Sequence, residues 1–153
     1  MMIRTLRFLS GKRGQALIEF ALVVPFLLLL MFTMVDFGIA IDRRLVLQHA
    51  VREGARYAAV HTDAVDITQL TSDQAQGIID IGDVDICYID QDDSNASPGD
   101  AGDAVKVSGS YTWDFPILRE IFGAFGASPI SIDMTPSGTA RLERSVSGAT
   151  ACS

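Results

Sequence analysis

The sequence predicts an α+β fold in which a long amino-terminal helix, embedded in a membrane over its first half, packs on a small antiparallel sheet. Three observations predict it: an uncharged apolar run near the start, a helical apolar stripe beyond that run, and short alternating segments in the second half. With 153 residues, the chain has room for one compact domain and an anchor. We expect a basic leader over 1–14, the helix over 15–61 and an exported globular domain over 62–153.

Charge is distributed unevenly between the leader and the rest of the chain. Four of the 12 Lys and Arg residues lie in residues 1–14 with no acid, which leaves eight to face all 19 Asp and Glu residues. A basic segment before an apolar run is typical of an amino terminus that stays in the cytoplasm. The acidic remainder argues against a nucleic-acid partner, which requires clustered Lys and Arg. We therefore expect a single-pass protein of the cytoplasmic (inner) membrane with its carboxy-terminal domain outside.

The apolar run predicts a membrane span. Residues 20–35 read FALVVPFLLLLMFTMV, and with residues 15–19 they form a helix of about 32 Å, long enough to cross the hydrocarbon core. We place the span at about 18–38, in contact with membrane lipid. The alternative is an ordinary secretory signal cut after Ala40. Three features argue against this alternative: the length of the apolar run, the acid at Asp36, and the helical pattern that continues past the cut.

Three residues of the span carry specific expectations. Pro25 cannot donate a backbone hydrogen bond, so we expect a kink there, either as a hinge or as a tolerated membrane proline. Asp36 and Gly38 mark the outer interface, where we expect the aspartate to be solvated and to have no special role.

Beyond the span, small and apolar residues recur at helical spacing and predict a packing face. They are Leu47, Ala50, Val51, Gly54, Ala55 and Ala58. Because the face is rich in Ala and Gly, the elements that pack on it can approach closely.

The start of the span carries a motif of a glycine, four residues, a glutamate and an aromatic residue: Gly14, Gln15, Glu19 and Phe20. This pattern resembles a class III prepilin leader, which implies cleavage between Gly14 and Gln15 by a prepilin peptidase. An ionised Glu19 in the membrane costs on the order of 1–3 kcal/mol, and the new α-amino group of the same or a neighbouring subunit could offset it. The alternative is a glutamate that reaches into the head groups.

Further fragments follow in order: R-G-Q-A at 13–16, E-F-A at 19–21, a leucine-rich run after Pro25, D-F-G at 36–38 and A-V-R-E-G-A-R-Y-A at 50–58. Together they resemble the TadE-like minor pseudopilins of bacterial Tad pilus systems. The resemblance implies a type IV pilin-like fold and a part in assembling a Tad/Flp-type pilus. It also implies, as partners, the prepilin peptidase, other pseudopilins, Flp-like pilins and the Tad membrane assembly platform. It leaves open whether the protein enters the pilus or only primes its assembly.

The alternative function is that of a membrane-tethered or secreted extracytoplasmic binding domain whose apolar segment is only an anchor or a signal.

The second half of the chain predicts short elements. We expect a helix capped at 71–73 that runs to about Ile79, strands over 84–88, 105–113 and 130–134, a polar loop over 90–103, a short amphipathic helix over 116–125, and renewed pairing over 139–143 after an interruption at Pro136 and Gly138. These strands read as one small antiparallel sheet whose apolar face is covered by the long helix.

No residues point to catalysis, a cofactor or a metal. His49 and His61 lack partners at ligand spacing, and the acidic loop fails as an EF-hand because Asn95 stands where glycine is required. A looser calcium site among Asp90, Asp92, Asp93, Asp100 and Asp103 stays as an alternative. Two cysteines, Cys87 and Cys152, either form a disulfide in an oxidising compartment or are free thiols.

Overall fold

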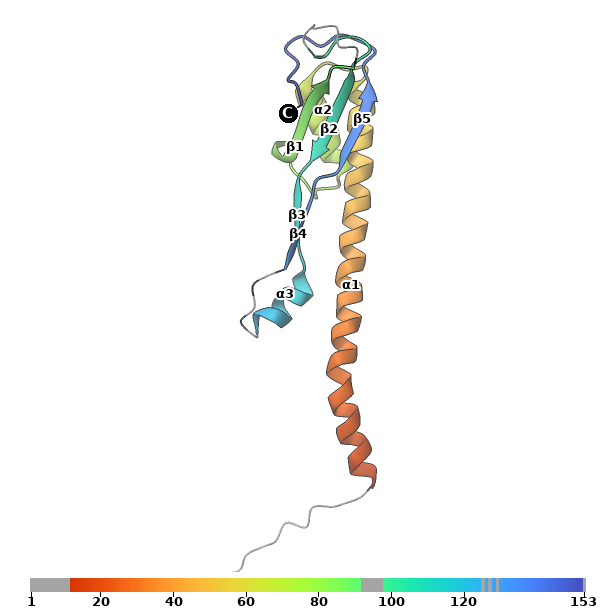
Figure 1. Cartoon of the computed structure of the whole chain (residues 1–153), viewed down its shortest axis with the longest axis vertical. Helices are drawn as coiled ribbons and strands as arrows, with labels where there is room; N and C mark the ends of the chain where they lie inside the picture. The colour runs from red at the N-terminus through yellow and green to blue at the C-terminus, as the bar shows by residue number, and fades with distance from the viewer. Residues whose placement is uncertain (1–11, 92–97, 125, 127, 129, 153) are drawn as a thin grey trace, which may run out of the picture.

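The computed structural model describes residues 12–91, 98–124, 126, 128 and 130–152, so most of the basic leader and part of the acidic loop lie outside the described residues. The elements are α1 (Lys12–Ala58), α2 (Ala64–Gln74), a 3₁₀ turn (Ile81–Asp83), β1 (Val84–Ile89), β2 (Ala104–Gly109), β3 (Tyr111–Asp114), α3 (Pro116–Gly123), β4 (Ser131–Met134) and β5 (Ser137–Arg141). One long helix with a small antiparallel sheet at its far end confirms the predicted α+β, pilin-like class (Figure 1).

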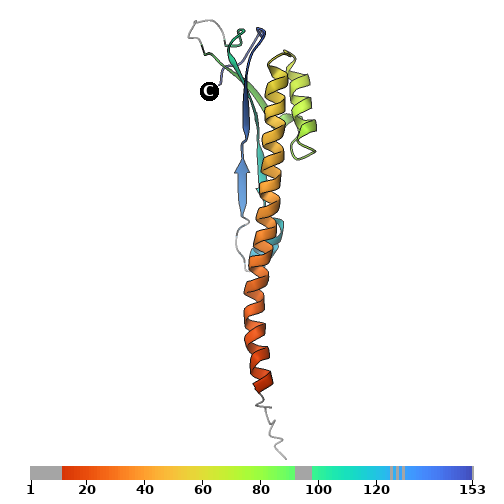
Figure 2. The ribbon, with the colours of Figure 1, turned by 90° about the vertical axis from the view of Figure 1, so that its right-hand side faces the viewer.

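The helix α1 has two halves with different surroundings. Its first half is bare: Leu17, Phe20 and Phe26 are each about two thirds exposed. That half is long and apolar enough to cross a membrane, which fits a single-pass anchor, and it includes Pro25. The second half is covered by the sheet on one side and by α2 on another (Figure 2). The helix ends at Ala58, three residues before the predicted end.

The sheet that covers α1 has three antiparallel strands in the order β1-β2-β5. On the central strand, Val105 lies opposite Tyr88 of β1 and Ala140 of β5. Val105 and Val107 are fully buried and belong to one apolar core with Leu47 of α1 and Ile67 of α2. Alternation along β2 therefore sends its apolar side chains to the helix, as predicted for a sheet with one covered face.

The predicted strand over 105–113 is wrong as a single strand of one sheet. It divides into β2 and β3, and β3 pairs only with β4 in a separate two-stranded ladder. The register nevertheless continues across the break, since Ser108 lies opposite Ser137 and Tyr111 lies opposite Met134. The break falls opposite Pro136, which has no N–H to donate, although its carbonyl accepts a bond from the Gly109 N–H (3.0 Å). We call β3, α3 and β4 the arm, because they extend from the sheet along α1 (Figure 1).

The remaining elements differ from the predictions in position. The helix predicted from 71–73 to about Ile79 is wrong: α2 begins at Ala64, where the Asp63 side chain caps the Val65 N–H (2.9 Å), and it ends at Gln74. Gly138 does not interrupt pairing but lies within β5. The short helix after Trp113 is confirmed as α3.

Candidate functional site

The predicted packing face of α1 lies under the sheet and α2. All six of its residues, Leu47, Ala50, Val51, Gly54, Ala55 and Ala58, are buried. Small side chains there let neighbouring backbones approach. A methyl group added at Gly54 would collide with the Thr71 side chain of α2. One added at Gly138 of β5 would lie 2.6 Å from the Val51 carbonyl oxygen, so this contact needs glycine on the strand as well as on the helix. We call this region the upper attachment.

A second attachment, which we call the clasp, joins the arm to α1 at Asp36. The Asp36 side chain is fully buried, and its Oδ2 accepts a hydrogen bond from the Leu118 N–H at 2.9 Å. Leu118 is the third residue of α3, a position whose backbone N–H normally donates a hydrogen bond to a capping side chain. Phe115, at the cap position itself, has no polar side chain, and Pro116 has no N–H. Asp36 therefore supplies, from 82 residues away, the cap that α3 lacks.

Aromatic residues surround this hydrogen bond. Phe37, next to Asp36, lies 5.0 Å from Phe115 between ring centroids, and Phe115 meets Trp113 edge to face at 6.5 Å. Trp113, Phe115, Leu118 and Met134 form an apolar cluster with Ala40 of α1. Among the described residues, two buried polar atoms of this region, Asp36 Oδ1 and Trp113 Nε1, have no hydrogen-bond partner. Within the described part of the chain, the clasp thus encloses a carboxylate with a single hydrogen-bond donor, which is costly if the carboxylate is charged.

The prediction of a solvated Asp36 without a special role is wrong. The physical reason is that the arm folds back over the helix and removes water from the carboxylate. A signal was present in the sequence: the residue before Pro116, at the cap position of α3, is the apolar Phe115, which offers no side-chain acceptor for the free N–H groups of the helix. Gly38, by contrast, has open space where a side chain would stand.

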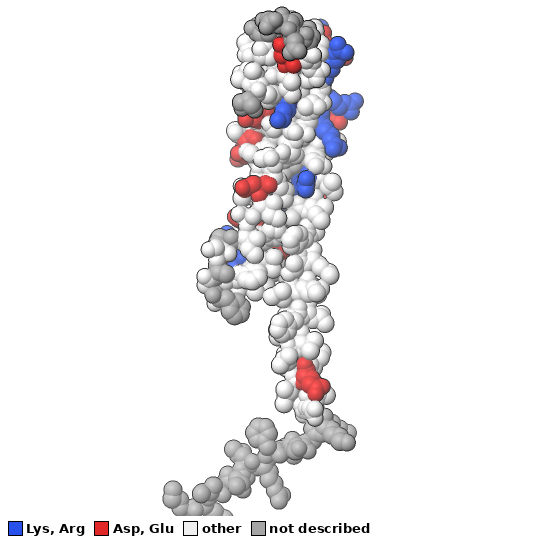
Figure 3. Space-filling view, in the orientation of Figure 1, with Lys and Arg blue, Asp and Glu red and all other residues white. Residues whose placement is uncertain are grey.

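The predicted processing motif, Gly14, Gln15, Glu19 and Phe20, lies on the bare first half of α1. Gln15 and Glu19 are exposed, and Gln15 Nε2 donates to Glu19 Oε1 at 3.1 Å. A side chain at Gly14 would meet nothing within 4 Å. Glu19 is the only acid between Gly14 and Val35, and Figure 3 shows an acidic group on an otherwise uncharged stretch there. The Gln15 side chain is neutral, so it does not compensate the charge of an ionised Glu19 near the start of the predicted span.

Two features of the chain beyond α1 concern the remaining candidate residues. Cys87 and Cys152 form a disulfide with a Cα–Cα distance of 4.9 Å, which ties the carboxy terminus to β1. In the acidic loop, the buried Asp103 side chain accepts bonds from the backbone N–H groups of Gln91, Gly99 and Asp100. That carboxylate therefore organises its own loop. Asp92 and Asp93 of the looser calcium alternative lie outside the described residues.

Comparison with known proteins finds a match over residues 14–56 to the family described as TadE-like protein. No curated protein and no solved structure matches the chain significantly. The matched segment begins at the glycine of the processing motif, includes Asp36 of the clasp and ends within the upper attachment. The resemblance to the TadE-like family is therefore confirmed over residues 14–56, which are similar to that family.

Proposed function

We propose that this protein is a non-catalytic minor pseudopilin that takes part in assembling a Tad/Flp-type pilus. The observation that carries the proposal is the TadE-like segment, which joins the G-x4-E-F motif to an exposed apolar half-helix. An ordinary anchor needs only apolar length, whereas a glutamate five residues after a cleavable glycine has a use in subunit assembly. Cleavage would place the Gln15 α-amino group one helical turn from Glu19, on the same or a neighbouring chain.

The proposal includes an orientation and a set of partners. The four basic residues of the leader favour an amino terminus in the cytoplasm and an exported sheet domain. The disulfide supports an oxidising environment for that domain. The partners proposed are a prepilin peptidase, other pseudopilins, Flp-like pilins and the membrane platform that assembles them.

The test is the intact mass and amino-terminal sequence of the protein isolated from membranes, with and without the prepilin peptidase. We expect a terminus at Gln15 that appears only with the peptidase, and Gly14→Leu should abolish it. A Gly38→Leu variant is the control, because its side chain also meets open space on α1. A terminus at Ile41, or an uncut chain in both strains, would favour the tethered or secreted binding domain.

A second measurement separates assembly from processing. We expect Glu19→Gln to be cleaved normally but to yield few or no surface fibres by electron microscopy. Normal fibre numbers in a strain that carries Glu19→Gln, or in one that lacks the gene, would contradict the assembly role.

A further inference from the structure

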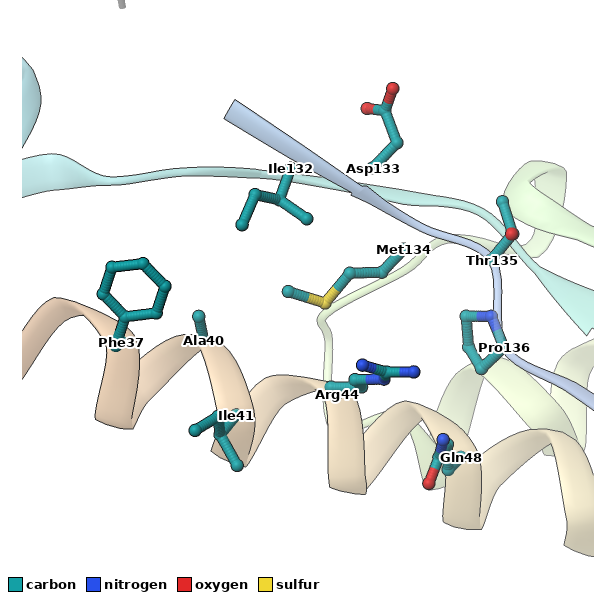
Figure 4. Close-up of a pocket in the computed structure, with 10 residues that line it drawn as sticks. All are labelled: Phe37, Ala40, Ile41, Arg44, Gln48, Ile132, Asp133, Met134, Thr135 and Pro136. Carbon is teal, nitrogen blue, oxygen red and sulfur yellow. The ribbon is translucent and has the colours of Figure 1, made fainter. Parts of the chain in front are cut away.

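A groove lies between the two attachments. It has a volume of about 390 Å³, and it is bordered by α1 between Phe37 and Gln48 and by residues 132–136, which lead from β4 into β5 (Figure 4). The groove is open to the surface at a point where no element of the described chain covers it.

The lining changes from apolar to polar along α1. Phe37, Ile41 and Ile132 line the end nearest the span, while Arg44 and Gln48 line the part farther out (Figure 4). Asp133 points away from the groove in Figure 4, and its Oδ1 accepts a bond from Thr112 Oγ1 at 2.8 Å. Among the residues that line the groove, Arg44 is therefore the charged side chain that faces it.

The position of this gradient matches the depth of a lipid leaflet. With the span ending near Gly38, Arg44 lies about 9 Å farther along the helix. The head-group layer adds roughly 5–8 Å to each side of the hydrocarbon core. A flexible arginine side chain in this position reaches the phosphates, while Phe37 and Ile41 lie at the boundary of the acyl chains.

The apolar end of the groove is also continuous with the exposed surface of the span. Ile41 and Ile132 are 58% and 41% exposed, and they follow a half-helix on which the leucines, Phe20 and Phe26 are exposed. Lipid that surrounds this half-helix can therefore enter the groove without crossing a polar barrier. Continuity with the span and the unopposed cation both favour lipid over a protein partner.

We propose that the groove binds an anionic phospholipid of the leaflet next to the exported domain. One acyl chain lies along Phe37, Ile41 and Ile132, and the phosphate meets the Arg44 guanidinium, whose planar N–H groups suit bidentate bonds to phosphate. The inference depends on the membrane anchor and not on a role in pilus assembly.

The single tryptophan of the chain provides the probe. Trp113 belongs to the same apolar cluster as Ala40 and Met134, and both of these residues line the groove. The full chain would be placed in phosphatidylcholine vesicles with increasing mole fractions of phosphatidylglycerol or phosphatidylcholine brominated on the acyl chains. We expect brominated phosphatidylglycerol to reach half-maximal quenching at a several-fold lower mole fraction.

Variants at two adjacent arginines identify the site. Arg44→Gln should remove the preference for phosphatidylglycerol, and Arg44→Lys should keep most of it. Arg43→Gln is the matched control, because it removes the same charge at nearly the same depth from a residue that does not line the groove. The control should leave the preference unchanged.

Four outcomes would overturn the proposal. Equal quenching by the two lipids would show random contact, and equal loss in both Gln variants would show a diffuse charge effect. Relief of quenching by millimolar inorganic phosphate would indicate a soluble phosphate ligand. Quenching that disappears at high protein-to-lipid ratio, together with cross-links between copies, would assign the groove to a second chain. None of these outcomes bears on the mature amino terminus, which tests the proposed function separately.

Discussion

The long helix is held at two places that are built on different physical principles. At the upper attachment, the sheet and α2 reach the helix through glycine, alanine and close backbone contact, and the contact depends on shape. At the clasp, one carboxylate caps a distant helix inside an aromatic cluster, and the contact depends on a directed hydrogen bond. A larger side chain in place of a glycine should therefore disrupt the upper attachment, whereas loss of the Asp36 acceptor should disrupt the clasp.

Each attachment has its own readout, which allows the comparison to be tested. Hydrogen exchange at the β2 amides reports the upper attachment, since β2 is the central strand of the sheet. The emission wavelength of Trp113 reports the clasp, because this side chain is only 9% exposed and shifts to the red when water reaches it. A change confined to one attachment should move one readout and leave the other in place.

The largest effect is expected from loss of the disulfide. Replacing both Cys87 and Cys152 with Ser opens a link over 65 residues of sequence, and the chain-entropy estimate for such a loop is about 4 kcal/mol. The carboxy-terminal residues, whose backbone pairs with Tyr88 on β1, should then detach, and β2 should exchange faster. The Trp113 emission should stay constant under native conditions. Unchanged exchange at β2 would show that the disulfide adds nothing to the upper attachment.

Alanine substitutions at Gly38 and Gly54 of α1 separate the effect of close packing on stability from the effect of helix propensity. Alanine gains up to about 1 kcal/mol over glycine inside a helix, so Gly38→Ala, in open space, should be neutral or stabilising. At Gly54 the same change forces Thr71 to move, and overpacking of this kind costs about 1–3 kcal/mol. We expect faster exchange at β2 and in α2 for Gly54→Ala alone. Equal behaviour of the two variants would contradict the account of the upper attachment.

A smaller effect is expected at the clasp. Asp36→Ala removes the acceptor for the Leu118 N–H, and loss of a helix cap costs about 1–2 kcal/mol. We expect a red shift of Trp113 emission with little change in β2 exchange. Asp36→Asn is the conservative control, because its side-chain oxygen can still accept the bond. Should Asp36→Ala instead leave the emission unchanged, the aromatic cluster alone would hold the arm.

The smallest effect concerns pH at the upper attachment. Burial raises the pKa of Tyr88 above its usual value of 10. In the unfolded chain the phenol loses its proton near pH 10, while the folded protein retains it. The contribution of the protonated phenol to the free energy of unfolding is therefore present below pH 10 and is lost as the pH rises through the folded pKa. We expect β2 exchange, corrected for its intrinsic pH dependence, to show domain opening above pH 10. Tyr88→Phe should remove part of that opening, and an identical profile in the variant would exclude Tyr88 as a cause.

Much of the fold could be predicted because local patterns carry it. The apolar run indicated the bare half of α1, and the spacing from Leu47 to Ala58 indicated its buried face. Alternation from Val105 to Trp113 marked extended backbone correctly, although it could not show that the strand leaves one sheet for another ladder. The start of α2 does not follow from the local sequence, because Asp63 and the polar residues at 71–73 can all cap a helix and only the fold shows that Asp63 does so.

The features of the candidate site likewise fall into those that depend on neighbouring residues in the sequence and those that depend on long-range contacts. The sequence by itself determined the membrane-length helix, the G-x4-E-F motif and the TadE-like segment, because each depends on residues close together along the chain. Only the tertiary structure decided the role of Asp36, the need for Gly138 and the groove beside Arg44. These features join residues that lie about 80 to 90 positions apart, and a single sequence carries no periodicity that links partners at such a distance. Burial, and with it the use of a polar side chain, is set by the element that folds over it.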